Sequence, residues 1–206
     1  MTASASPFVS VVMTARHDNY GGDFRERIAT PLLFNYERLS EQGVPYELIL
    51  VEWDPIPGRP LLCDMHTKEF PDVTEKILRP IVVAPQYQLA MTQNPRVPYL
   101  EYVAKNVGIR RATAPFVLVT NADILLGRDP VTVIAERRLE PGTVYRAPRC
   151  DIKLGIDQVG LSWSALEDRA NQVRQPDLKP PLFSSAAGVF LLSDRDTFHR
   201  LRGFNE

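Results

Sequence analysis

Two polar side chains, Asn121 and Asp123, end the otherwise apolar stretch FVLVTNADILL (116–126). Residues two apart in extended or turning backbone point the same way, so both side chains can face one ligand. Oxygen ligands of this kind suit a hard divalent cation whose shell is completed by phosphates and water. The alternative is a turn or helix cap, which Asn and Asp also favour. Because Asp129 is available to cap the next helix, we favour the ligand-binding interpretation.

Glu52 and Asp54 flank Trp53 at the end of a second apolar stretch, YELILVEW (46–53). These acids can accept hydrogen bonds from a nucleobase or from ribose hydroxyls, and Trp53 could stack on the base. The alternative is a solvated loop beside a core tryptophan, and the sequence leaves both open.

Arg16 and His17 follow a third apolar stretch, VSVVMTA (9–15). Arginine can pair with a phosphate, but a surface salt bridge explains it equally well. Asn106 lies within a predicted helix, where asparagine is a poor helix former. It either faces solvent or makes a polar contact to a ligand.

Several familiar site patterns are missing from the sequence. It contains no GxGxxG, GxxxxGK[ST], GxSxG, HExxH or CxxC. These absences argue against a dinucleotide fingerprint and a P-loop. Cys63 and Cys150 have neither metal-site nor redox spacing, so we expect reduced thiols.

Apolar periodicity predicts the elements that must position these side chains. Strands are predicted at 7–15, 46–53, 79–85, 116–120, 143–152 and 185–193, and helices at 31–42, 98–111, 129–138, 162–173 and 194–201. We expect Pro31 to open the first helix and Ser193 to cap the last. Strands that alternate with helices predict an α/β fold with a mostly parallel central sheet and helices on both faces. Ligands of such sheets bind beyond the carboxyl ends of the strands, where all three polar groups fall.

Composition narrows the class of protein further. The chain has 206 residues, 44% hydrophobic and 24% charged, with a formal net charge of −1. This length suits one domain. The charge offers no basic stripe, so we expect no nucleic-acid partner. The N-terminus lacks a signal-peptide pattern and no stretch is long enough to span a bilayer, so we expect no membrane span and a cytoplasmic location.

Four segments together resemble the nucleotide-sugar-binding domain of GT-A glycosyltransferases, especially the family-two-like group. They are VSVVMTAR (9–16), YELILVEWDP (46–55), AKNVGIRRATAPFVLVTNAD (104–123) and GVFLLSDRDTFHRLRGFNE (188–206). The resemblance covers most of the chain. It implies a single Rossmann-like domain, 1–206, with a nucleotide-sugar-binding half at 1–125 and an acceptor-side half at 126–206.

The resemblance also implies an activity and a site. The activity is transfer of a sugar from a nucleoside diphosphate sugar, with UDP expected, to a hydroxyl of a glycan or other acceptor. Asp123 corresponds to the acid that ligates Mn²⁺ or Mg²⁺, and Asn121 replaces the first acid of Asp-x-Asp. The implied donor-binding residues are Thr14, Ala15, Arg16, Glu52, Asp54, Asn106, Asn121 and Ala122.

Three acids are candidates for the general base of an inverting reaction, namely Asp151, Asp194 and Glu206. In relatives the base often lies in a later acidic motif, so the resemblance leaves open whether the acceptor-side half continues beyond Glu206. Asp194 is more simply explained as an acid in the first turn of a helix.

Two other functions remain open on the sequence. Asn121 in place of an acid is compatible with a binding module that holds a nucleotide sugar or a glycan without chemistry. A sugar nucleotidyltransferase is a weaker alternative, because such an enzyme should have a basic glycine-rich loop after its first strand. The loop RHDNYGG (16–22) has glycines but few positive charges.

Overall fold

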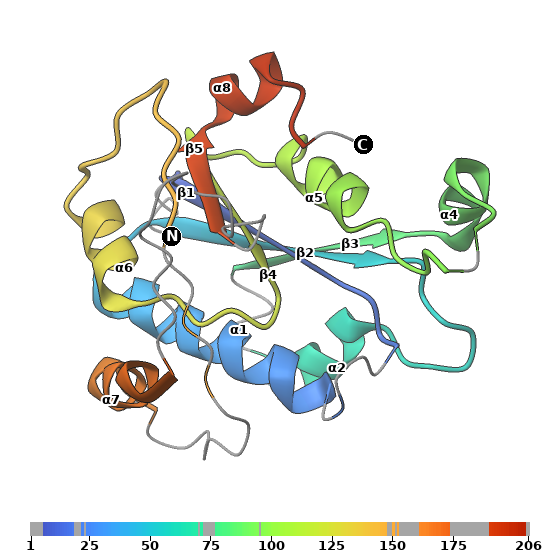
Figure 1. Cartoon of the computed structure of the whole chain (residues 1–206), viewed down its shortest axis with the longest axis horizontal. Coiled ribbons are helices and arrows are strands. Elements are labelled where there is room, and N and C mark those ends of the chain that lie inside the picture. Colours follow the sequence, from blue (N-terminus) through green and yellow to red (C-terminus); the bar gives the residue numbers. More distant parts are fainter. Residues whose placement is uncertain are drawn as a thin grey trace.

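A five-stranded sheet forms the centre of the fold (Figure 1). The computed structural model describes residues 6–18, 22, 24–69, 71, 77–94, 96–147, 150, 152, 161–173 and 190–204. Its strands are β1 (Val9–Ala15), β2 (Tyr46–Trp53), β3 (Leu78–Val83), β4 (Phe116–Asn121) and β5 (Phe190–Asp194). They lie in the order β3-β2-β1-β4-β5, and only β5 runs antiparallel to its neighbour. The predicted α/β class with a mostly parallel sheet is confirmed.

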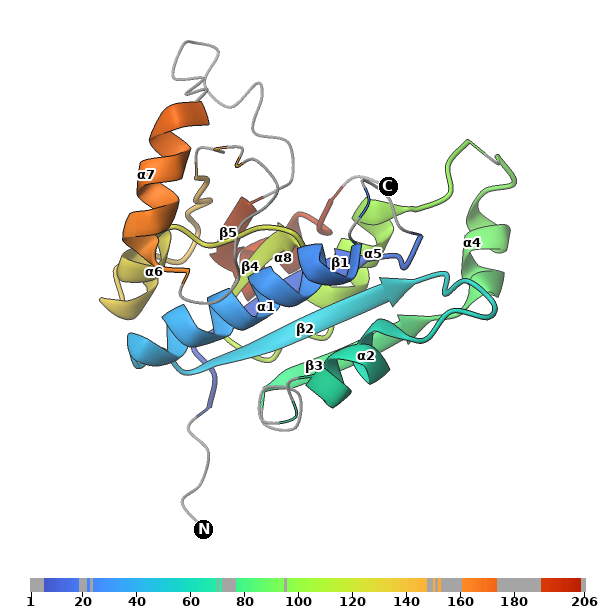
Figure 2. The ribbon, with the colours of Figure 1, turned by 90° about the horizontal axis from the view of Figure 1, so that it is seen from below.

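Helices cover both faces of this sheet, which is why its central strands are apolar on both sides. On one face lie α1 (Phe24–Glu41), α2 (Leu62–Glu69), α6 (Arg128–Ala135) and α7 (Trp163–Val173) (Figures 1 and 2). On the other lie α5 (Glu101–Ile109) and α8 (Arg195–Arg200), whereas α4 (Pro85–Met91) follows the carboxyl end of β3. None of the described helices is both long and apolar enough to cross a bilayer.

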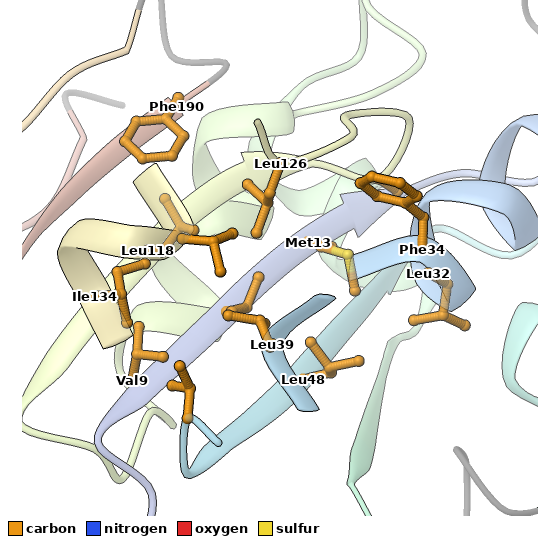
Figure 3. Packing of buried hydrophobic residues seen from close by; sticks show 14 of the residues in the cluster. Val9, Met13, Leu32, Phe34, Leu39, Leu48, Leu118, Leu126, Ile134 and Phe190 are labelled. Carbon is orange, nitrogen blue, oxygen red and sulfur yellow. The ribbon is translucent and has the colours of Figure 1, made fainter. Parts of the chain in front are cut away.

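Each face has its own hydrophobic core. Under α1 and α6, Val9 and Met13 pack with Leu39 and Ile134 (Figure 3). On the opposite face, Val12 packs with residues of α5 and α8 such as Ile109 and Phe198. Helix α5 packs closely on β1 at Gly108, where a Cβ would lie 2.3 Å from Val12 Cγ1.

The boundaries of several elements differ from the prediction. The first helix begins at Phe24, and Pro31 lies inside it rather than at its start, because Ile28 and Leu32 on either side of the proline are both buried in the core. Helices α2 and α4 were not predicted, since their short polar sequences carry little periodicity. Within the described residues, the predicted strand 143–152 amounts to one bridge between Tyr145 and Leu192.

Both predicted helix caps were wrong. Helix α6 has Gly127 at its N-cap position with no side-chain cap, and Asp129 lies in the first turn. At α8 the cap is Asp194, whose Oδ1 accepts a hydrogen bond from Thr197 N at 2.9 Å. Ser193 instead donates to the Thr143 carbonyl.

Candidate functional site

The carboxyl ends of the parallel strands bring together the three polar groups that the sequence singled out. Thr14 is the register partner of Asn121, and Ala15 is the partner of Glu52. One or two residues after these positions come Arg16, Asp54 and Asp123. All of them therefore lie where the parallel strands end, which is called the carboxyl edge below. The predicted juxtaposition is therefore present.

An ion pair joins the end of β1 to the end of β2. Arg16 Nη2 lies 2.8 Å from Asp54 Oδ2, and Arg16 Nε donates to the Asp54 carbonyl at 3.2 Å. Asp54 adopts a left-handed backbone conformation with φ 48°. Aspartate and asparagine adopt this region more readily than other non-glycine residues do. The arginine expected to meet a phosphate is thus held in place by the acid expected to meet ribose or base.

Glu52, two residues before Asp54, is almost fully buried. Its Oε2 accepts a hydrogen bond from Leu62 N at 2.8 Å, at the start of α2. Its Oε1 is buried and makes no hydrogen bond within the described part of the chain. Burial raises the pKa of Glu52, although the Leu62 N–H opposes the shift.

Trp53 does not offer a stacking surface. The residue is 1% exposed within the core, and its Nε1 donates to Gln88 Oε1 at 2.6 Å. Of the two interpretations left open on the sequence, the core tryptophan is the one that the structure has.

Basic side chains contact both polar residues at the end of β4, Asn121 and Asp123. Lys105 Nζ donates to Asn121 Oδ1 at 2.8 Å and lies 2.5 Å from Glu101 Oε1. Lys105 is fully buried, and this burial lowers its pKa while Glu101 opposes the shift. Arg27 Nη2 lies 2.5 Å from Asp123 Oδ2. Ala122, between the two polar residues, is buried in the core.

The acids at this edge limit how a divalent cation could be held. Among the described residues, no group of three His, Cys, Asp or Glu side chains could hold a metal ion. Asp123 keeps its second oxygen, Oδ1, outside the pair with Arg27, and its side chain is 35% exposed. One carboxylate oxygen fits Mg²⁺ or Mn²⁺ only if phosphates and water complete the shell. The residues therefore fit a metal that arrives with a phosphate, not a cage built by the protein.

Two further side chains at this edge have buried polar atoms without good hydrogen bonds. Thr14 Oγ1 and Tyr99 Oη are both buried, and neither makes a hydrogen bond of normal geometry within the described residues. Burial raises the pKa of Tyr99, and the nearby Thr14 hydroxyl opposes this shift. Thr14 was a predicted donor-binding residue, whereas Tyr99 was missed because the predicted helix 98–111 included it as an apolar residue, and α5 begins only at Glu101.

Arg27 was also missed, and the reason is the misplaced start of the first helix. The predicted helix began at Pro31, which left Arg27 in an unassigned loop. Counting the helix from Phe24 would have placed Arg27 in its first turn, near the carboxyl edge.

Other predicted site residues lie elsewhere. Asn106 faces the end of the chain, where its Oδ1 accepts from Phe204 N at 2.8 Å and its Nδ2 donates to Phe204 O at 3.0 Å. Asp194 is the register partner of Phe116, the first residue of β4. It therefore lies at the amino end of the parallel strands, opposite the carboxyl edge. There it accepts hydrogen bonds from Gly142 N and Thr197 N. Asp151 and Glu206 lie outside the described residues.

Comparison with known proteins gives likenesses of fold. No family profile matches the chain, and no curated protein matches it. A structure of TarS residues 1–349 from S. aureus is 15% identical with a TM-score of 0.48, covering 94% of this chain and 48% of that one. The galactosyltransferase LgtC, in complex with donor and acceptor sugar analogues, is 16% identical with a TM-score of 0.45, covering 93% of this chain and 59% of that one.

A nucleotidyl transferase from Methanothermobacter is 12% identical with a TM-score of 0.46, covering 97% of this chain and 77% of that one. The chain thus spans about half the length of the TarS structure. The resemblance to GT-A nucleotide-sugar transferases rests on the sequence motifs. Likenesses with TM-scores below 0.5 are too distant to decide activity or substrate.

Proposed function

We propose that this chain is a glycosyltransferase domain that moves a sugar from a nucleoside diphosphate sugar, with UDP as the nucleotide, to an acceptor hydroxyl. The observation that supports this most is the pairing of two arginines with two acids at the carboxyl edge. Arg16 pairs with Asp54, and Arg27 pairs with Asp123. Each arginine is placed where a ligand of an open parallel sheet binds.

The chemistry of the edge matches the parts of such a donor. Arginine forms strong, charge-assisted hydrogen bonds to phosphate oxygens, so Arg16 and Arg27 are suited to the diphosphate. Asp54 can accept hydrogen bonds from ribose hydroxyls or base N–H groups. The buried Thr14 and Tyr99 hydroxyls lie near each other at this edge, where they could exchange hydrogen bonds with a polar ligand.

The central difficulty of the reaction is the charge that develops on the leaving diphosphate. Fixed positive charges stabilise such a charge without reorganising during the reaction. Asp123 is the residue that would hold Mn²⁺ or Mg²⁺, and a bound ion would add to this stabilisation. Asp151 and Glu206 stay predictions for the general base, whereas Asp194 faces the opposite edge and is engaged as a helix cap.

One observation favours a second candidate, a module that binds a nucleotide sugar without chemistry. Asn121 replaces the first acid of the Asp-x-Asp pattern, and its side-chain oxygen accepts a hydrogen bond from Lys105. Asp123 is then the one acid of the pattern that a metal could use. This module would bind nucleotide at the same edge, and only turnover separates the two functions.

The test is release of UDP from a panel of UDP-sugars by the full chain, with Mn²⁺ and with EDTA. We expect release that is lost with EDTA and in Asp123→Ala, but kept in Arg138→Gln, which removes an exposed charge elsewhere. Release that survives EDTA would contradict the metal role of Asp123. Binding without release would favour the module, and pyrophosphate formation from UTP and a sugar phosphate would favour the nucleotidyltransferase.

A further inference from the structure

A cavity of about 160 Å³ is lined by residues in and just after α5 and α8. These two helices cover the face of the sheet opposite α1 (Figure 1). Its apolar wall is formed by Ile109 and Phe198, which are both buried. Its remaining lining includes three basic residues, Arg110, His199 and Arg202, all exposed to solvent. The cavity is separate from the carboxyl-edge site, and nothing in the proposed function uses it.

The chain builds this cavity with an unfavourable backbone conformation. Arg202 follows the C-cap of α8, Leu201, and adopts a left-handed conformation with φ 63°. Glycine is the usual residue at this position because it has no Cβ to clash. An arginine there is locally unfavourable, yet its side chain lines the cavity. Arg137 has the same left-handed conformation after α6 but does not line the cavity, so it is the location of the Arg202 side chain that matters here.

The bend that carries Arg202 is locked in place. Asn106 is almost fully buried, and its side-chain amide bonds both the N–H and the carbonyl of Phe204. Gly203 fits between them because it has no side chain, since a Cβ there would lie 2.0 Å from Asn106 Oδ1. Because the backbone of this bend is already fixed, binding would not have to order it.

The lining of the cavity has one sign of charge. Three basic side chains line it and no carboxylate does, in a protein whose net charge is −1. The acid nearest in the helix, Asp196, is not among the lining residues. The volume is well below the roughly 300–1,000 Å³ of pockets for drug-sized ligands, so the cavity suits a small group. Guanidinium groups recognise phosphate oxygens through paired hydrogen bonds.

We propose that this cavity binds a phosphate group, either as inorganic phosphate or as a small phosphate monoester, through Arg110, His199 and Arg202. The Arg110 and Arg202 guanidinium groups donate to the phosphate oxygens, and His199 adds a ring N–H. Because the site lies away from the strand ends, its existence does not depend on the sugar-transfer proposal.

The test is a residue-resolved NMR titration of the full chain with sodium phosphate and, separately, with methyl phosphate, at constant ionic strength set by chloride. We expect saturable shifts of the backbone amides of Ile109, Arg110, His199 and Gly203. Tighter binding of methyl phosphate would identify a monoester as the ligand, and tighter binding of phosphate would identify the free ion.

Arg202→Gly is the decisive variant because it should improve the fold while removing the site. We expect its Tm to rise by about 2–4 °C, since glycine suits the left-handed position. We expect phosphate affinity to fall at least about tenfold, the loss typical of one charge-assisted hydrogen bond. Arg110→Gln should weaken binding similarly, and Arg138→Gln should leave it unchanged. Shifts that do not saturate, or that are equal in Arg202→Gly and wild type, would overturn the proposal.

Discussion

Arg16 Nη2 lies 2.8 Å from Asp54 Oδ2, and this contact ties the ends of the two neighbouring strands β1 and β2 together. Both side chains are largely buried, at 17% and 16% exposed. The pair therefore holds an arginine and an acid in fixed positions before any ligand arrives. Preorganised charges of this kind favour binding because little side-chain freedom is left to lose.

Asp54→Asn should separate binding from folding. Asparagine tolerates the left-handed conformation that Asp54 adopts, so we expect Tm to change by no more than a few degrees. The neutral amide no longer fixes Arg16 by charge, so the affinity for UDP should fall about tenfold, as for loss of one charge-assisted hydrogen bond. Calorimetric titration and thermal unfolding measure the two quantities. Asp129→Asn, in the exposed first turn of α6, is the control, and equal UDP affinity in all three proteins would contradict this role.

Arg27→Gln should change metal and nucleotide binding in opposite directions. The guanidinium and a divalent cation compete for the Asp123 carboxylate, so removing the guanidinium should strengthen Mn²⁺ binding in the absence of nucleotide. A partly exposed ion pair contributes at most about 1 kcal/mol, so the gain should be roughly two- to fivefold. UDP binding should weaken because a phosphate partner is lost.

Electron paramagnetic resonance of free Mn²⁺ measures the first effect without any activity. Arg138→Gln is again the charge-matched control. If Arg27→Gln binds Mn²⁺ no better than the control does, the ion pair does not oppose metal binding at Asp123.

The apolar stretches were enough to predict the three strands β1, β2 and β4, because these strands are buried on both faces and read as short apolar runs. The grouping of the polar residues at one end of the strands was also predictable, because each follows a parallel strand. The side chains that pair with Asn121 and Asp123 could not be predicted. Lys105 and Asn121 are 16 residues apart and Arg27 and Asp123 are 96 apart. Such contacts depend on where each helix lies against the sheet. Because the first helix was predicted to begin at Pro31 instead of Phe24, Arg27 was not considered as a site residue.

Glu52→Gln should remove a pH dependence of stability. Burial raises the pKa of Glu52, so the folded state holds this proton more tightly than the unfolded state does. Between the ordinary glutamate pKa of about 4.3 and the raised value, stability must fall as pH rises. Glutamine keeps an acceptor for Leu62 N and has no such dependence. Urea unfolding at pH 4.5, 6 and 7.5 should show wild type losing stability relative to the variant. A difference that is constant with pH would contradict the shift.

Gly203→Ala and Gly142→Ala form a matched pair. Both glycines have a left-handed φ, near 80°, so alanine strains the backbone at either position. A Cβ on Gly142 meets nothing within 4 Å, whereas one on Gly203 would lie 2.0 Å from Asn106 Oδ1. We expect Gly142→Ala to cost about 1 kcal/mol and Gly203→Ala clearly more, because it also breaks the Asn106 clamp on Phe204. Urea unfolding measures both, and equal losses would mean that Asn106 gives way freely.

The most direct test of the proposed nucleotide site is calorimetric titration of UDP into wild type and Asp123→Ala, with and without Mn²⁺. We predict binding that is strengthened by Mn²⁺ in the wild type, with this metal effect lost in Asp123→Ala. This result would locate the nucleotide at the end of β4. Absence of UDP binding in wild type, with Mn²⁺ and without it, would contradict the central claim that this edge holds a uridine diphosphate donor.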